Sequence, residues 1–134
     1  MKYVADTHAV LRFMYHHQSI GKAARAAFEG CTAGTAHIYI PAVVISEMIM
    51  VVERNRIPAL TMAQCIADLE KLRLDPGYTL LSLEPERIIA SHTLTAIPDI
   101  FDRLIVAEAR HRNVPLITRD TLIVAAGVVE TVWD

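Results

Sequence analysis

The chain has 134 residues, of which 53% are hydrophobic and 21% are charged. This composition supplies enough apolar side chains for a core and excludes an intrinsically disordered chain, and the length predicts one domain covering residues 1–134. The formal net charge is −2, which excludes a general attraction to nucleic acid, so any such contact needs a local patch of cations.

The first 55 residues predict two strands that alternate with helices. The strand patterns are KYVAD (2–6) and HIYIPA (37–42), and the helical patterns are HAVLRFMYHH (8–17), GKAARAAFEG (21–30) and AVVISEMIMVVERN (42–55). Gly30 predicts the end of the second helix, because glycine favours the C-terminal cap. Pro41 is suited to end the second strand and to open the third helix.

The second half of the chain continues the alternation. Thr61 heads the helical pattern of residues 61–74, and Asp75, Pro76 and Gly77 predict a turn. The remaining patterns are a strand at YTLLSL (78–83), a helix at PERIIASHTLTA (85–96), a helix from Asp99, a strand at VPLIT (114–118) and a possible strand in VVETVWD (128–134). Alternation of this kind predicts an α/β fold, with a parallel sheet of four to five strands covered by helices on both faces.

Acidic residues fall where these elements meet. Asp6 and Asp120 follow two of the strands, and Glu47 lies in the first turns of the helix after the second strand. Asp99 and Asp102 begin another helix, three residues apart and therefore on one side of it. Since sites in parallel sheets form beyond the carboxyl ends of the strands, we expect these five carboxylates to lie along one edge.

A cluster of carboxylates requires compensation. Two like charges about 4 Å apart repel by roughly 4 kcal/mol at an effective dielectric near 20. Ion pairs with Arg103 or Arg119 are one solution, and a divalent cation is the other. Carboxylate oxygens select hard ions, so the pattern favours Mg²⁺ or Mn²⁺.

Each acid also has an ordinary structural interpretation. Asp6 is suited to cap the first helix, and Glu47 to be an ordinary helix carboxylate. Asp99 and Asp102 form a possible N-cap with its reciprocal acid, and Asp120 a possible turn residue before a last helix. For any single acid this interpretation is the stronger one, whereas the whole set in this order favours a site.

The set of motifs resembles the PIN-domain ribonucleases, and specifically the VapC-type toxins of toxin–antitoxin pairs. The residues that carry the resemblance are Asp6 in YVADTHAVL, Glu47 in PAVVISEM, Asp102 in DIFDRLIVAEA and Asp120 in LITRD, together with the closing VVETVW. The resemblance implies a three-layer α/β/α sandwich. It also implies metal ligands at these four acids, with Asp99 as a possible fifth.

The same resemblance implies endonucleolytic cleavage of RNA that depends on Mg²⁺ or Mn²⁺, a cognate antitoxin and a homodimer. Asp6 is expected to be the principal ligand, with Asp102 and Asp120 beside it and Glu47 acting through water. Small hydroxyls beside the acids, and three arginines as candidate phosphate contacts, complete the expected surroundings: Thr7, Ser46, Thr118, Arg12, Arg103 and Arg119. Surface ion pairing is the default interpretation of each arginine.

Three other classes compete with this interpretation. A phosphorelay receiver domain needs paired acids after the first strand and a late lysine, but only Asp6 follows that strand and no lysine follows Lys71. A phosphohydrolase with an aspartyl nucleophile needs DxD, where this chain has DTH. A non-catalytic PIN-like scaffold that binds RNA or protein remains the main alternative.

Two further features complete the sequence. Glu108 departs from similar sequences, which often carry a neutral polar residue there, and its apolar neighbours on a helical wheel leave it without an evident role. Cys31 and Cys65 lack the spacing of a zinc site and are expected to be buried thiols. We find neither a signal peptide nor a run of about 18 apolar residues, and therefore expect a cytoplasmic protein.

Overall fold

The computed structural model describes residues 1–134 with the exception of the His17 side chain. Its elements in chain order are β1 (Lys2–Ala5), α1 (Thr7–Tyr15), the 3₁₀ helix η1 (His17–Ser19), α2 (Lys22–Ala33), β2 (His37–Ile40), α3 (Ala42–Glu53), α4 (Met62–Leu74), β3 (Tyr78–Leu80), α5 (Pro85–Ser91), α6 (Ile100–Arg112), β4 (Leu116–Ile117), α7 (Thr121–Ala126) and β5 (Thr131–Val132). The predicted alternation of strands and helices is therefore confirmed.

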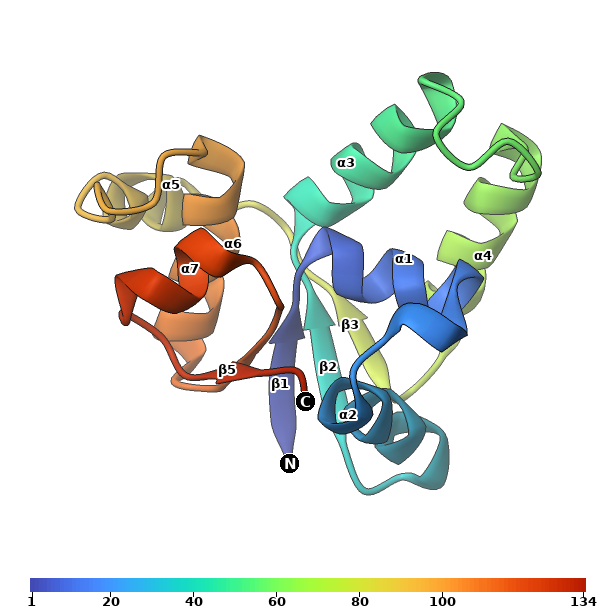
Figure 1. Cartoon of the computed structure of the whole chain (residues 1–134), viewed down its shortest axis with the longest axis horizontal. Coiled ribbons are helices and arrows are strands. Elements are labelled where there is room, and N and C mark those ends of the chain that lie inside the picture. Colours follow the sequence, from blue (N-terminus) through green and yellow to red (C-terminus); the bar gives the residue numbers. More distant parts are fainter.

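The five strands form one parallel sheet in the order β3-β2-β1-β4-β5. Helices surround this sheet, with α6 against β1, α2 against β2 and α4 against β3 (Figure 1). The arrangement confirms the predicted three-layer α/β/α architecture. Because the strands run the same way, their carboxyl ends lie together, at the top of Figure 1.

The central strands β1 and β4 are largely buried, and their ends lie at that edge of the sheet. Val4 and Ala5 are fully buried, and they pair with Leu116 and Ile117 of β4, which are also fully buried. At about 25 cal/mol per Å² of apolar surface, burial of such side chains is the main force that holds the sheet together. Residues directly after β1 and β4 are consequently held in place by the core.

Several element ends differ from the sequence prediction. The helix expected to close at Gly30 continues to Ala33, and Gly34 caps it in the left-handed conformation, with φ +79°. Gly30 instead lies against the following loop, where a Cβ atom would come within 2.8 Å of the Ala36 Cβ. The prediction for Thr61 is confirmed, since its side chain accepts a hydrogen bond from the Gln64 N–H at 3.1 Å.

The structure provides a physical account of Glu108. Its side chain is only 3% exposed and forms an ion pair with Arg112, with 3.7 Å between Oε2 and Nε. The Arg112 guanidinium also lies 4.5 Å from the centre of the Tyr39 ring on β2. Burial raises the pKa of Glu108, and Arg112 opposes that increase. Glu108 thus belongs to a buried contact between α6 and the sheet.

The remaining expectations concern thiols and membranes. Cys31 and Cys65 are both buried and free, as predicted. Among the described residues, no helix combines the length and apolar character needed to cross a bilayer.

Candidate active site

Asp6 lies between β1 and α1 and is 6% exposed. Its Oδ1 accepts a hydrogen bond from the Ala9 N–H at 2.8 Å, so the capping role is confirmed. Its second oxygen, Oδ2, accepts a short hydrogen bond from the Thr118 hydroxyl. Burial raises the pKa of Asp6 to about 6, although both hydrogen bonds act in the opposite direction. The carboxylate is therefore held rigidly in a site that disfavours its charge.

The segment after β4 supplies the second acid. Thr118 is fully buried, and its Oγ1 accepts a hydrogen bond from the Asp120 N–H at 3.1 Å while donating to Asp6. Asp120 caps α7 by accepting from the N–H groups of Leu122 and Ile123 at 2.9 and 3.0 Å. One threonine hydroxyl thus connects the backbone at Asp120 with the side chain at Asp6.

Glu47 reaches the same edge from α3. It is half-buried, and its Oε1 accepts a hydrogen bond from the Thr7 hydroxyl at 2.6 Å. Thr7 is the first residue of α1 and is itself buried. Two of the three predicted hydroxyls therefore orient acids, whereas Ser46 is exposed on α3.

The start of α6 brings Asp99 and Asp102. Asp99 is exposed and caps the helix, its Oδ1 accepting from the N–H groups of Phe101 and Asp102 at 2.7 and 3.3 Å. Among the described residues the Asp102 carboxylate makes no reciprocal bond to the Asp99 N–H, so a complete capping box is absent. The cap explains Asp99, but it leaves the half-buried Asp102 without a structural role.

Asp102 is the point on which the acids converge electrostatically. Burial and, in decreasing order, the charges of Asp99, Asp120, Glu47 and Asp6 together raise its pKa to about 7. Four separate segments of the chain therefore place carboxylates close enough to disfavour the ionisation of one residue. The expected gathering of the five acids at the carboxyl edge of the sheet is found.

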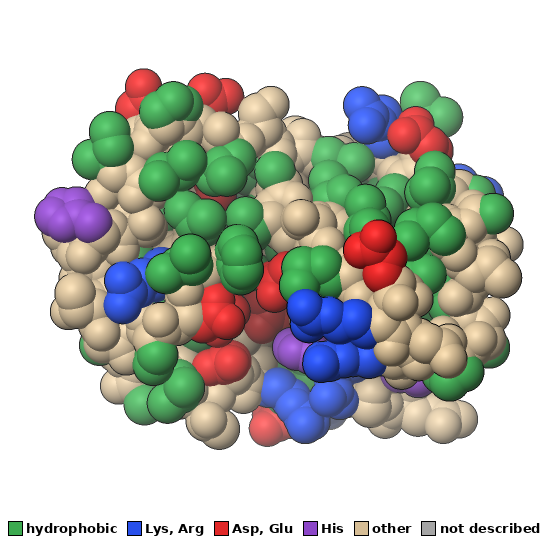
Figure 2. Space-filling model, turned by 90° about the horizontal axis from the view of Figure 1, so that it is seen from above, with side chains coloured by type: hydrophobic (Ala, Val, Ile, Leu, Met, Phe, Trp, Pro, Cys, Tyr) green, Lys and Arg blue, Asp and Glu red, His purple; other side chains and the backbone are tan. Residues whose placement is uncertain are grey.

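Basic side chains face these acids. A cavity of about 190 Å³ is lined by the acids Asp6 and Asp120 together with His8, Arg12 and Arg119. Seen onto the carboxyl end of the sheet, acidic and basic side chains meet near the middle of the molecule (Figure 2). The site therefore joins negative and positive charge across one hollow.

The Trp133 ring lies near two arginine side chains. The Arg12 and Arg119 guanidinium carbons each lie 6.0 Å from the centre of its ring, near the limit of a cation–π contact. Burial, followed by the charge of Arg119, lowers the pKa of Arg12, and the charge of Asp6 acts in the opposite direction. Neither arginine forms an ion pair with a described carboxylate. Two converging guanidinium groups without an ion-pair partner are suited to bind an anion.

Other sequence expectations are modified by the structure. Arg103 does not face this hollow as a free cation, since its Nε donates a hydrogen bond to the Ile97 carbonyl at 2.6 Å. The role of Trp133 was missed, because the sequence indicated only a last strand there. Its proximity to Arg12 depends on a contact between the two ends of the chain, which no local pattern reveals.

The chemistry of the donor set fits a hard divalent cation. All five candidates are carboxylates, and their mutual repulsion at Asp102 is relieved by a positive charge among them. Within the described part of the chain, however, no three His, Cys, Asp or Glu side chains stand close enough to hold one ion. The acids thus lie at one edge of the sheet without being gathered around a common point.

Several solved structures resemble this chain over nearly its whole length. A chain in the crystal structure of VapBC2 from Rickettsia felis, bound to a promoter DNA fragment, is 17% identical with a TM-score of 0.73, covering 100% of both chains. A chain of VapBC-1 from nontypeable Haemophilus influenzae is 13% identical with a TM-score of 0.70, covering 98% of this chain and 97% of that one. VapC20 from Mycobacterium tuberculosis, a sarcin-ricin loop cleaving toxin, is 18% identical with a TM-score of 0.64, covering 98% and 99%.

These structural neighbours are too distant in sequence to show more than the fold. No curated protein sequence matches this chain significantly. The family model of the PIN domain does match, and it covers residues 3–128. This range includes all five acids and nearly the whole sheet. The chain therefore belongs to the PIN-domain family.

Proposed function

We propose that this protein is a metal-dependent endoribonuclease that hydrolyses RNA phosphodiester bonds, with residues 1–134 as one nuclease domain. The observation that carries the proposal is the convergence of Asp6, Glu47, Asp99 and Asp120 on the half-buried Asp102. A structure that only needed helix caps would not bring its carboxylates together at an electrostatic cost. Unpaired arginines across the same cavity supply what a phosphodiester backbone requires.

Asp6, Asp102 and Asp120 are the proposed ligands of Mg²⁺ or Mn²⁺, with Asp99 as an additional ligand. A bound divalent ion supplies activated water and neutralises charge on the phosphate. Glu47, fixed by the Thr7 hydroxyl, is placed to accept a hydrogen bond from the attacking water. Arg12 and Arg119, which line the same cavity as Asp6 and Asp120, bind phosphate oxygens. Thr118 keeps Asp6 and Asp120 in register throughout.

A second candidate is a PIN-like scaffold that binds RNA or protein without cleaving. One observation favours it, namely that no three potential ligands among the described side chains are near enough for a common ion. Such a scaffold would not cleave RNA, so the replacement of one acid by its amide would not change a cleavage activity. The cleavage experiment below therefore separates the two candidates.

We propose that this protein is the toxin of a toxin–antitoxin pair, and the support is its likeness in fold to solved toxin structures. Structures similar to this chain include VapBC complexes and a toxin that cleaves the sarcin-ricin loop. A cognate antitoxin, a second copy of this chain and a cytoplasmic location complete the proposal. Large exposed apolar side chains on α5, α6 and α7 support the homodimer, and they are Ile88, Ile89, Ile100, Phe101, Leu122 and Val124. Sedimentation of the protein with Ile100→Glu beside the wild type tests this association.

The central experiment is cleavage of total RNA by purified protein with Mg²⁺, with Mn²⁺ or with EDTA. We expect cleavage only with a divalent ion, and its loss in Asp6→Asn and Glu47→Gln. Loss of a direct ligand should exceed the 10- to 100-fold effect, roughly, of changes one shell further out. Glu53→Gln is the matched control, because Glu53 is exposed at the other end of the same helix.

The variants also need to be folded for the comparison to hold. Asp6→Asn removes a charge that burial disfavours, so its folding should be unchanged or improved. Undiminished cleavage by Asp6→Asn would contradict the assignment of the site. Absence of cleavage together with absence of Mn²⁺ binding would favour the scaffold.

A further inference from the structure

A second cavity continues from the acidic site along α1. It has a volume of about 240 Å³ and shares His8 and Arg12 with the cavity that contains Asp6 and Asp120. The two hollows therefore form one path, with carboxylates at one end. No part of the proposed hydrolysis uses the far end.

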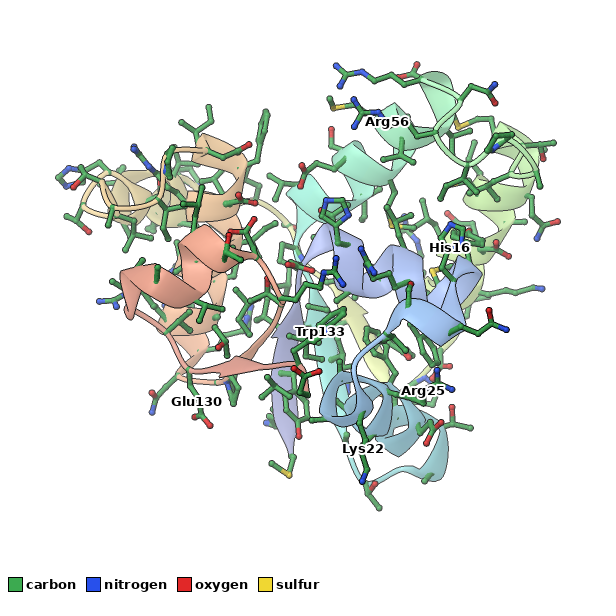
Figure 3. The ribbon with its side chains drawn as sticks, in the orientation of Figure 1. His16, Lys22, Arg25, Arg56, Glu130 and Trp133 are labelled. Carbon is green, nitrogen blue, oxygen red and sulfur yellow. The ribbon has the colours of Figure 1, made fainter. Side chains whose placement is uncertain are left out.

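The far end combines apolar walls with positive charge. Its apolar walls are Leu11 of α1, Val51 of α3 and Ile57 of the following loop. His16, at the end of α1, and Arg56, on the loop after α3, also line it, and both are labelled in Figure 3. This lining would suit a flat, apolar group that carries negative charge beside it.

Hydrogen bonds to backbone carbonyls hold two of these lining residues. The Arg56 N–H donates to the Val51 carbonyl at 3.1 Å, which closes the chain after α3. Arg12 is restrained at the other side, since its Nη1 donates to the Ser19 carbonyl at 3.1 Å. Arg56 forms no ion pair with any carboxylate in the described part of the structure. The cavity thus presents prearranged walls and an uncompensated cation.

Nucleic acid alternates anionic phosphates with flat bases. Bases of single strands stack on aromatic and guanidinium planes, whereas bases of a duplex are inaccessible to such a pocket. The lining has both components, because guanidinium groups without ion-pair partners and two imidazoles stand beside apolar side chains in the same cavity. An acidic peptide would use the cations but has no need of the apolar walls.

We propose that this cavity binds one unpaired nucleobase of the RNA, with Arg56 on the phosphate at one side of that nucleotide and Arg12 with Arg119 on the phosphate at the other. The inference rests on the proposed function, and it defines the substrate as single-stranded or looped RNA. The base pocket anchors the strand so that the next phosphodiester lies over the carboxylates.

Binding without metal tests the pocket separately from cleavage. The probes are fluorescein-labelled eight-residue strands of A, C or U, an abasic strand of equal length and a duplex, all measured by anisotropy in EDTA. We expect the preferred base-containing strand to bind about tenfold more tightly than the abasic strand, as is typical of one stacked base. The duplex should bind no better than the abasic strand.

Variants assign that preference to the cavity. Ile57→Ser should reduce the ratio of base-containing to abasic affinity towards one while leaving affinity for the abasic strand unchanged, which also shows that the fold is intact. Ile66→Ser is its matched control, since Ile66 is exposed on α4 away from the cavity. Arg56→Glu should weaken both strands, and Arg54→Glu, two residues away and outside the cavity, should not.

The outcomes separate the two proposals. A base preference that Ile57→Ser leaves intact would overturn the pocket even if the protein cleaves RNA. Equal affinity of the wild type for base-containing and abasic strands would do the same. A preference abolished by Ile57→Ser in a protein that never cleaves would support the pocket and overturn the nuclease.

Discussion

At the scale of single residues, Asp6 caps a helix and also lines the acidic cavity. Its Oδ1 caps α1, and its Oδ2 faces Thr118 and the rest of the acids. A cap costs the carboxylate only one oxygen, so capping and metal binding are compatible. Asp99 and Asp120 likewise cap α6 and α7 through one carboxylate oxygen each. The helix N-termini place the acids as well as being stabilised by them.

Thr118 is a residue whose removal tests positioning. Thr118→Val keeps the shape of the side chain but removes the hydroxyl that orients Asp6 and accepts from the Asp120 N–H. We expect a loss of cleavage of about 10- to 100-fold, measured as kcat/KM, with weakened Mn²⁺ binding. Thr118→Ser keeps the hydroxyl and should retain most of the activity. Equal losses in the two variants would point to packing instead of hydrogen bonding.

The acids should also make stability depend on pH. The folded-state pKa of Asp6 is about 6 and that of Asp102 about 7, above the ordinary value of 3.8. The folded protein therefore binds protons at these two carboxyl groups more tightly than the unfolded chain does. The contribution of this proton binding to the free energy of unfolding is complete below about pH 4 and is lost as the pH rises through about 6 to 7. Without divalent ions, the urea midpoint should be lower at about pH 7.5 than at about pH 5.

Asp102→Asn is the control for this pH dependence. The variant lacks one of the two titrating groups, so its midpoint should change less over the same range. Added Mn²⁺ should raise the wild-type midpoint chiefly at the higher pH, where the carboxylates are ionised. A wild type and a variant with parallel pH profiles would refute the coupling of Asp102 to its neighbours.

At the scale of elements, the short strand β5 pairs with β4, and the residue after it makes a close contact with α2. The Trp133 carbonyl accepts a hydrogen bond from the Ala24 N–H at 2.9 Å, which joins the C-terminal strand to α2. A Cβ atom at Gly21 would stand 2.2 Å from that carbonyl oxygen. Gly21 therefore allows Trp133 to approach α2 and to reach Arg12 and Arg119.

Gly21→Ala should displace this strand. The φ of Gly21 is −66°, which alanine adopts freely, so the expected destabilisation of about 1–3 kcal/mol comes from overpacking alone. Urea unfolding measures it, and the emission of Trp133, the single tryptophan, should shift in the folded state. Gly34→Ala is the control: its φ of +79° costs about 1–2 kcal/mol, but no atom lies within 4 Å of the added Cβ. An emission shift in both variants, or in neither, would contradict the role of Gly21.

At the scale of the whole molecule, the net charge is small and the acids and arginines of the site are concentrated in one place. The formal net charge is −2, yet one hollow pairs a group of acids with Arg12 and Arg119. Affinity for RNA must then arise from few phosphate contacts and not from a general field. The negative remainder of the surface would limit nonspecific binding.

Salt dependence measures the number of those contacts. Each phosphate neutralised in a single strand contributes about 0.7 to the slope of log K against log salt. The double variant Arg12→Gln/Arg119→Gln should therefore reduce that slope by about 1.4. Arg73→Gln, whose arginine pairs with Glu70 at 3.5 Å on α4, should leave it unchanged. An unchanged slope in the double variant would remove both arginines from the RNA path.

The sequence by itself determined the order of elements and the parallel sheet, because hydrophobic periodicity and caps such as Thr61 act locally. It also indicated which acids lie at the carboxyl edge, since that position follows from chain order in a parallel sheet. It misplaced the end of α2, where the left-handed conformation falls at Gly34 and not at Gly30. Two glycines close together offer the same local signal, and packing of Gly30 against Ala36 decides between them.

Only the tertiary structure decided how those acids are held and what faces them. The hydrogen bond from Thr118 to Asp6 joins residues 112 positions apart, and the bond from Thr7 to Glu47 joins residues 40 apart. The contact of Arg112 with the Tyr39 ring of β2 and that of Trp133 with two arginines likewise depend on segments brought together by the sheet. Local propensity extends over a few residues, whereas side-chain chemistry at this edge depends on packing between distant ones.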